Sequence, residues 1–188
     1  LYWYQLSADQ GYSGAQNKLG DFYSKGIGVE QDYQKANEFY QKAVDQNNYL
    51  AQHSLGNSYF HGRGVEIDYV KAFELFKLSA DRTYATAQYN VGLCYYNGYG
   101  VDKDYTQAVY WYELSSDGGY ANAQNALGRC YYDGTGVTQD YAKAIQYFNL
   151  AATQKFSGAQ FYLGRCYENG YGVDKDVQTA VDWYKLAA

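Results

Sequence analysis

The side chains with the strongest potential chemistry are three cysteines and two histidines. Cys94, Cys130 and Cys166 recur at intervals of 36 residues, while His53 and His61 lie eight residues apart in one earlier stretch. Nucleophilic catalysis needs a nucleophile, a base and a group that orients the base. With only two histidines, both in one stretch, the sequence shows no such set, so we predict that the chain is not an enzyme.

The histidine spacing also fails to match a metal site. Metal-binding helices place histidines at positions i and i+4 and add further ligands. Asn57 lies between His53 and His61 and is a poor third ligand. We therefore predict no metal site, and we expect both histidines at solvated helix positions.

Short glycine motifs such as Gly98-x-Gly100 superficially resemble phosphate-binding loops. The third glycine of a dinucleotide fingerprint is missing, and no strand precedes the motif. Asp102 and Asp104 lack the further ligands of a calcium loop. The sequence predicts no cofactor, and these residues are explained by turns and helix caps.

A unit of 36 residues sets the position of all these side chains. The dipeptide Ala-Gln opens the unit without any insertion at Ala15, Ala51, Ala87, Ala123 and Ala159. A fixed period of this length indicates a solenoid, so we treat the chain as a single array. We divide it into the end of a preceding repeat (1–14), four full repeats (15–50, 51–86, 87–122 and 123–158) and an incomplete final repeat (159–188). Neither end has a polar cap, so we expect the natural protein to continue at both ends.

The residue pattern of each unit predicts two helices. In the unit that opens at Ala123, the first helix is expected over about 120–133, because Ala123, Leu127, Gly128 and Tyr131 share one helical face. A second helix with a buried stripe follows, and a turn of about three residues leads to the next unit. Each first helix also has a glycine in its middle, which predicts a close approach of the two helices. These glycines are Gly20, Gly56, Gly92, Gly128 and Gly164.

The loop inside each unit carries three recurring residues. A first glycine is expected to end the first helix in the left-handed conformation: Gly26, Gly62, Gly98, Gly134 and Gly170. A second glycine, two positions later, again supplies an unusual backbone dihedral: Gly28, Gly64, Gly100, Gly136 and Gly172. An aspartate is placed to cap the second helix: Asp32, Asp68, Asp104, Asp140 and Asp176.

Composition narrows the class of partner. The net charge of −5 argues against a nucleic-acid backbone, which needs clustered lysine and arginine. Aromatic residues make up 20% of the chain, which is too many for a disordered segment. No run of 18 apolar residues is present, so we predict no membrane segment in the chain.

The recurring pattern resembles a known family. The pattern A-Q-x-x-L-G-x-x-Y-x-x-G-x-G-V-x-x-D-x-x-x-A-x-x-W-Y-x-L-A-A, readable at Ala159–Ala188, is similar to the Sel-one-like repeat (SLR), a relative of the tetratricopeptide repeat. The resemblance covers the whole chain. It implies an all-α fold of stacked antiparallel helix pairs in a right-handed superhelix, with first helices on the concave side. It also implies an adaptor or scaffold role in signalling or complex assembly.

The cysteines depart from the secreted, cysteine-rich branch of this family. That branch pairs two cysteines inside each repeat, whereas Cys94, Cys130 and Cys166 stand one per unit. Equivalent points on packed helices lie about 8–10 Å apart, too far for a disulfide. We predict three free thiols and a cytoplasmic location, since unpaired thiols favour a reducing compartment. Hydrolysis of β-lactams, linked to the cysteine-rich branch, is an alternative that the resemblance keeps open.

Three first-helix positions vary from unit to unit and face away from the apolar stripe, and by family analogy they lie on the concave face. Tyrosine and arginine are enriched at binding hot spots. We predict a partner-binding face formed by Tyr89, Leu93, Tyr96, Arg129, Tyr132, Phe161 and Arg165. The arginines are expected to bind a carboxylate of a protein or peptide partner. In the opposing interpretation the tyrosines pack against neighbouring units and the arginines pair with local acids. A structural spacer or an array that self-associates end to end is the alternative function.

Overall fold

The computed structural model describes all 188 residues and contains eleven helices and no strand. The first helices of the repeats each have 13 residues: α2 (Ser13–Lys25), α4 (Tyr49–His61), α6 (Ala85–Asn97), α8 (Ala121–Asp133) and α10 (Ser157–Asn169). The second helices are α1 (Tyr2–Asp9), α3 (Tyr33–Val44), α5 (Tyr69–Ala80), α7 (Tyr105–Asp117), α9 (Tyr141–Thr153) and α11 (Val177–Ala187). The helix expected over about 120–133 is confirmed as α8, with Tyr120 at its N-cap.

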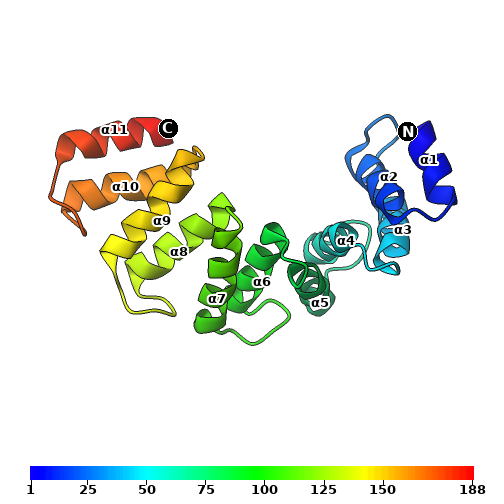
Figure 1. Cartoon of the computed structure of the whole chain (residues 1–188), viewed down its shortest axis with the longest axis horizontal. Helices are drawn as coiled ribbons and strands as arrows, with labels where there is room; N and C mark the ends of the chain where they lie inside the picture. The colour runs from blue at the N-terminus through cyan, green and yellow to red at the C-terminus, as the bar shows by residue number, and fades with distance from the viewer.

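The helix pairs follow one another along an arc, with the two ends of the chain at opposite sides (Figure 1). Each helix packs against its neighbours in sequence, and α8 also contacts α10 directly. In Figure 1, α2, α4 and α6 lie on the inner side of the arc relative to α3, α5 and α7. The fold is the all-α solenoid that the repeat predicts. None of the eleven helices combines the length and the apolar character needed to cross a membrane.

The predicted caps are confirmed in every repeat. Gly26, the first of the helix-ending glycines, has φ 66°, and its four counterparts have the same left-handed conformation. Each predicted aspartate lies at an N-cap and accepts a hydrogen bond from a backbone amide three residues later, as Asp104 does from Gln107 (2.9 Å). Such a bond satisfies one of the free amides at a helix start. The two helices of each pair are therefore bounded by local chemistry.

The mid-helix glycines allow the two helices of a pair to touch, as predicted. A Cβ atom added to Gly92 would lie 2.6 Å from two ring atoms of Tyr112 and 3.1 Å from the carbonyl oxygen of Ala108. An aromatic ring of the second helix occupies the same space in every repeat, contributed by Tyr40, Phe76, Tyr112, Phe148 and Tyr184. These rings form the floor beneath the first helices.

The second glycine of the loop has a role that its position in sequence does not reveal. Gly100 has φ 71°, and a Cβ atom there would lie 2.7 Å from the backbone nitrogen of Val70 and would also meet the backbone of Tyr69. Both residues belong to the start of α5, the second helix of the preceding repeat. The glycine therefore allows consecutive repeats to stack, in addition to shaping its own loop.

The turns between repeats have close to the expected length of about three residues. They contain four residues before α4 and α6 and three before α8 and α10. Their shared feature is one residue with positive φ, which is Asn47 (59°), Thr83 (59°), Gly119 (81°) or Lys155 (61°). The repeat alignment did not single out this position, because four different residue types occupy it.

Thr83 is poorly suited to this conformation, and its replacement by asparagine should stabilise the protein. A β-branched residue is disfavoured at positive φ, whereas asparagine adopts it readily and stands at the equivalent position 47. Thr83 is exposed and its side chain makes no hydrogen bond. We expect Thr83→Asn to raise the free energy of unfolding by about 1 kcal/mol, measured by urea denaturation. Thr138→Asn, at an exposed loop position without positive φ, is the control and should change it by less than about 0.5 kcal/mol.

Candidate functional site

Four of the seven predicted binding residues meet in one hollow between α6 and α8. We call it the central hollow, and its volume is about 250 Å³. Tyr89, Leu93 and Tyr96 line it from α6, and Arg129 lines it from α8. The other lining residues are Asn97, Tyr112, Asn122, Asn125, Ala126 and Phe156. The hollow has aromatic and amide walls and one charged group.

The central hollow is part of a longer groove. A hollow of about 90 Å³ between α4 and α6 shares Leu93 with it. A third hollow, of about 350 Å³ between α2 and α4, shares Asn57 and His61 with the second. We call these three adjoining hollows the first-helix groove, because successive first helices form its sides.

The groove is positively charged although the chain is acidic. Its lining includes Lys25, Arg63 and Arg129 but only one acidic residue, Asp21. The whole chain has a net charge of −5. Complementary charge guides a partner to a site and selects among partners, so the groove favours an acidic partner.

The two predicted arginines are held by aromatic rings and make no ion pair with local acids. Arg165 lies 5.6 Å from the ring centre of Tyr132 and 6.0 Å from that of Tyr162. Arg129 lies 6.0 Å from the same Tyr162 ring. All four salt bridges of the chain involve lysine. This result overturns the interpretation that local acids neutralise the arginines, and both guanidinium groups keep free donors.

The remaining predicted residues fall outside the central hollow. Phe161, on α10, is 47% exposed. Tyr132 is only 7% exposed, because Tyr141, Tyr162 and Tyr171 pack around its ring. The structure therefore corrects the prediction that Tyr132 contacts a partner directly. Its ring instead supports Arg165 from below.

His53 also differs from the prediction. It is half-buried between repeats, and its ring packs edge-on against Tyr84 and near Phe76. The side-chain amide nitrogens of Asn57 and Asn90 each lie 3.1 Å from Nε2 of His53. An amide nitrogen can only donate, so Nε2 accepts. Burial lowers the pKa of His53 to about 4. His61 is exposed, as predicted.

Lowering the pH should reduce the free energy of unfolding through the protonation of His53. The folded-state pKa of about 4 lies below the ordinary value of 6.5, so the unfolded chain binds the proton first as the pH falls. The contribution of neutral His53 to the free energy of unfolding is fully present above pH 6.5. It declines between pH 6.5 and 4, by about 2–3 kcal/mol for this shift.

Urea denaturation at pH 7, 5.5 and 4 measures this decline in the free energy of unfolding. The decline should be smaller in His53→Asn, which introduces the residue found at the equivalent positions 17 and 125. Burial and the nearby Arg63 also lower the pKa of His61, but less than burial lowers that of His53, so His61→Asn should reduce the decline by less. An unchanged decline in His53→Asn would contradict the assignment.

The cysteines are the three free thiols that the spacing predicts. All three are buried, and burial raises the pKa of Cys94 and Cys130 to about 12 and that of Cys166 to about 11. A thiol must ionise before it can act as a nucleophile, so these cysteines are structural. No group of three or more histidine, cysteine or acidic side chains is arranged to hold a metal ion.

Six lining residues of the central hollow were not among the predicted binding residues, and Tyr112 and Asn125 are the two whose polar groups matter most below. Tyr112 belongs to the column of apolar floor residues, and its type gave no sign that the hollow opens onto it. Asn125 lies on the variable face, but amides are common on solvated helices. The sequence signal that could have identified Tyr112 is the residue type at the floor position of each repeat. This position is tyrosine, with a hydroxyl, at Tyr40, Tyr112 and Tyr184, and phenylalanine at Phe76 and Phe148.

The fold is that of a repeat solenoid, and the sequence places the chain in a family. The chain matches the Sel1 repeat at residues 1–12, 13–48, 50–84, 85–120, 121–156 and 157–188. The chain therefore belongs to the Sel1 repeat family, as the Sel-one-like pattern indicates. Proteins of this family are generally non-catalytic scaffolds that bind protein partners.

Solved structures agree with this assignment. A protective antigen of uropathogenic Escherichia coli strains with an SLR fold is 33% identical, with a TM-score of 0.93, over 98% of this chain and 40% of its own. A Sel1 repeat protein of Oxalobacter formigenes is 34% identical, with a TM-score of 0.90, over 95% of this chain and 71% of its own. This chain thus spans well under half of the Escherichia coli relative.

The cysteine-rich branch is a more distant relative. Cysteine rich protein B of Helicobacter pylori is 23% identical, with a TM-score of 0.55, over 69% of this chain and 92% of its own. At this identity the likeness concerns the fold alone. Comparison with curated protein sequences gave no match.

Proposed function

We propose that the first-helix groove holds an extended, acidic segment of a partner protein, and that the chain acts as a scaffold within a larger signalling or complex-assembly protein. The observation that carries this proposal is the meeting of Tyr89, Leu93, Tyr96 and Arg129 in one hollow of a positively charged groove. Aromatic residues and arginine supply much of the energy at protein interfaces. Arg165, on the adjoining repeat, offers a second cation.

The groove suits a short segment. Its three hollows lie between four successive first helices. Helices that pack side by side are about 8–10 Å apart, so the groove extends over roughly 20–30 Å. An extended chain covers about 3.3 Å per residue, which corresponds to roughly six to nine residues. A nucleic-acid backbone would need a denser cluster of cations than three.

The proposal also includes a reducing compartment such as the cytoplasm. Its support is the burial of three unpaired thiols, since oxidising compartments favour disulfides.

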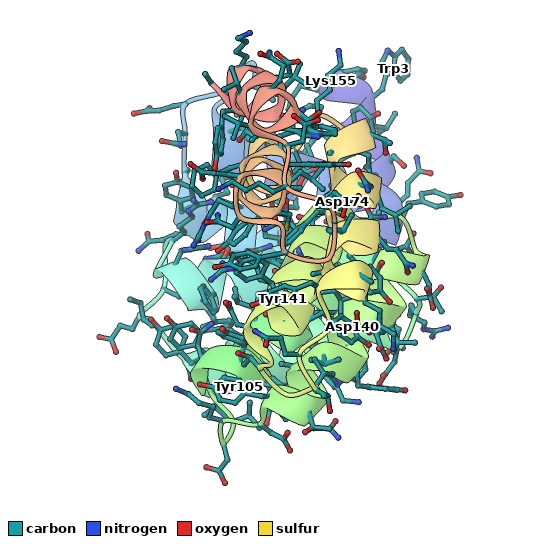
Figure 2. All side chains as sticks on the ribbon, turned by 90° about the vertical axis from the view of Figure 1, so that its left-hand side faces the viewer. Trp3, Tyr105, Asp140, Tyr141, Lys155 and Asp174 are labelled. Atoms are coloured by element: carbon teal, nitrogen blue, oxygen red, sulfur yellow. The ribbon has the colours of Figure 1, made fainter.

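A competing interpretation is a spacer or a self-associating array. Trp3 on α1 is 76% exposed and projects from the edge of the molecule (Figure 2), and Leu186 on α11 is 63% exposed. Sedimentation velocity over a concentration series tests this interpretation directly. A mass that rises with concentration supports association, and a constant monomer mass contradicts it.

Selection from a phage-displayed library of random nonapeptides tests the groove. We expect the chain to enrich peptides that combine aromatic or apolar residues with aspartate or glutamate. Leu93→Asp places a carboxylate where the central and second hollows meet, beside Arg129 and Tyr112. It should weaken the selected peptides at least about tenfold, because it repels their acidic side chains and competes for the same donors. Leu150→Asp, 48% exposed on α9, is the matched control and should bind normally.

Three outcomes of the selection are informative. Loss of binding in Leu93→Asp alone supports the groove. Equal binding by both variants moves the site to another surface. Enrichment of no peptide by the unaltered chain overturns the proposal and favours the spacer interpretation.

A further inference from the structure

The floor tyrosines differ in how their hydroxyl groups are satisfied. The hydroxyl of Tyr40 donates to Oδ1 of Asp21 (3.1 Å), and the hydroxyl of Tyr184 donates to Oε2 of Glu168 (2.7 Å). In both cases the carboxylate comes from the first helix of the same repeat. A carboxylate that accepts from a hydroxyl forms a strong, charge-assisted hydrogen bond. Two repeats thus provide their own acid for the floor hydroxyl.

Tyr112, the third floor tyrosine, has no such acid. Leu93 stands where Asp21 stands in its repeat, and Tyr96 stands where Glu168 does. The Tyr112 side chain is only 2% exposed, yet it lines the central hollow, and its hydroxyl makes no hydrogen bond within the chain. Its hydroxyl oxygen is accessible from the hollow and is not sealed in the interior, so it is free to donate to an acceptor that enters from outside.

Two further donors face the same hollow. Arg129 makes no ion pair, and its guanidinium group carries five N–H donors. Asn125 also lines the hollow, and its amide makes no hydrogen bond, with its oxygen buried away from water. No acidic side chain lines this hollow. A hydroxyl, an amide and a guanidinium group therefore line a space that no carboxylate of their own repeats enters.

We propose that Tyr112, Arg129 and Asn125 form a subsite for one aspartate or glutamate carboxylate of the bound segment. The partner's acid would occupy the role that Asp21 and Glu168 have in the other repeats. This inference rests on the proposed function and adds the position at which the segment must be acidic. A single carboxylate suits the subsite better than a phosphate group, because phosphate carries nearly two charges and Arg129 is the one cation here.

A double-mutant cycle tests the subsite. The probe is a nonapeptide from the selection described above, together with twins in which each Glu is replaced by Gln and each Asp by Asn, one at a time. On the chain side, Tyr112→Phe removes only the hydroxyl, and Phe76 and Phe148 show that the fold accepts phenylalanine at this position. Tyr184→Phe, which removes a hydroxyl outside the groove, is the matched control. Circular dichroism verifies folding, and fluorescence anisotropy gives Kd.

We expect Tyr112→Phe to weaken the acidic peptide about tenfold, since a hydrogen bond to a charged group contributes that much or more. One amide twin should respond differently, namely the twin that lacks the carboxylate bound in the subsite. For this twin, Tyr112→Phe should weaken binding less than about twofold. Tyr184→Phe should leave both affinities unchanged.

If Tyr112→Phe affects the acidic peptide and every amide twin equally, the subsite is wrong while the groove stands. If the unaltered chain binds acidic and amide peptides equally well, the subsite is also wrong. If the library yields no peptide at all, the groove and the subsite fail together.

Discussion

Replacing Gly100 by alanine should lower the free energy of unfolding by about 3 kcal/mol or more. Part of the loss is local, because a left-handed residue with a Cβ costs about 1–2 kcal/mol, and Gly100 has φ 71°. The larger part is a collision with the backbone of Tyr69 and Val70 in the preceding repeat. Backbone at a helix start cannot move aside as a flexible side chain can, so the repeats must separate. Forcing atoms into a packed site typically costs about 1–3 kcal/mol on its own.

Gly28 provides the matched control for this prediction. It occupies the same loop position and has φ 70°, but a Cβ atom there would meet nothing within 4 Å. Gly28→Ala should therefore show only the local cost, about 1–2 kcal/mol. Urea denaturation followed by circular dichroism measures both variants. Equal losses would mean that the loop conformation matters and that the contact between repeats does not.

This pair of glycines also shows what a sequence can and cannot predict. An unusual backbone dihedral at Gly28 and Gly100 follows from residue type and position in the loop, and both residues have the positive φ that this prediction implies. The contact of Gly100 with Tyr69 depends on how one repeat stacks on the next, which no local pattern contains. The helices, their caps and the close approach at Gly92 were predictable for the same reason, since each depends on residues within one repeat.

In the candidate site, too, features set within one repeat were predictable and contacts between repeats were not. Tyr89, Leu93, Tyr96 and Arg129 were predicted because their helical spacing places them on one variable face, and the structure brings them together. Tyr132 and His53 hold positions on that face too, but other side chains cover them. Tyr162 and Arg165 of the next repeat cover Tyr132, and Asn90 of the next repeat covers His53 together with Tyr84 of the turn that leads into it. Burial of this kind depends on contacts between repeats. Tyr112 was missed because a position in the apolar floor column does not show where the floor opens into a hollow.

Replacing Gly92 by alanine should destabilise the protein by about 2–3 kcal/mol and deform the central hollow. In an open helix this substitution is favourable by about 1 kcal/mol. Here the new Cβ atom would lie 2.6 Å from two ring atoms of Tyr112, which is only 2% exposed. Overpacking of a filled interior typically costs about 1–3 kcal/mol, and the carbonyl oxygen of Ala108 at 3.1 Å limits relief by a shift of the helix. Displacement of Tyr112 would move the floor of the hollow, so peptide affinity should fall as well.

A second substitution identifies the collision as the cause. Tyr112→Leu removes the ring atoms that the new methyl group would meet, so Gly92→Ala should cost much less in that background than in the unaltered chain. Residues in direct contact typically show coupling energies of about 0.5–3 kcal/mol in such cycles. Gly14→Ala, in α2 with nothing within 4 Å of the added Cβ, is the control and should be neutral or slightly stabilising. If the cost of Gly92→Ala is the same with and without the ring, the close contact between α6 and α7 does not explain the glycine. A large coupling would show that one glycine sets both the spacing of the helix pair and the depth of the hollow above it.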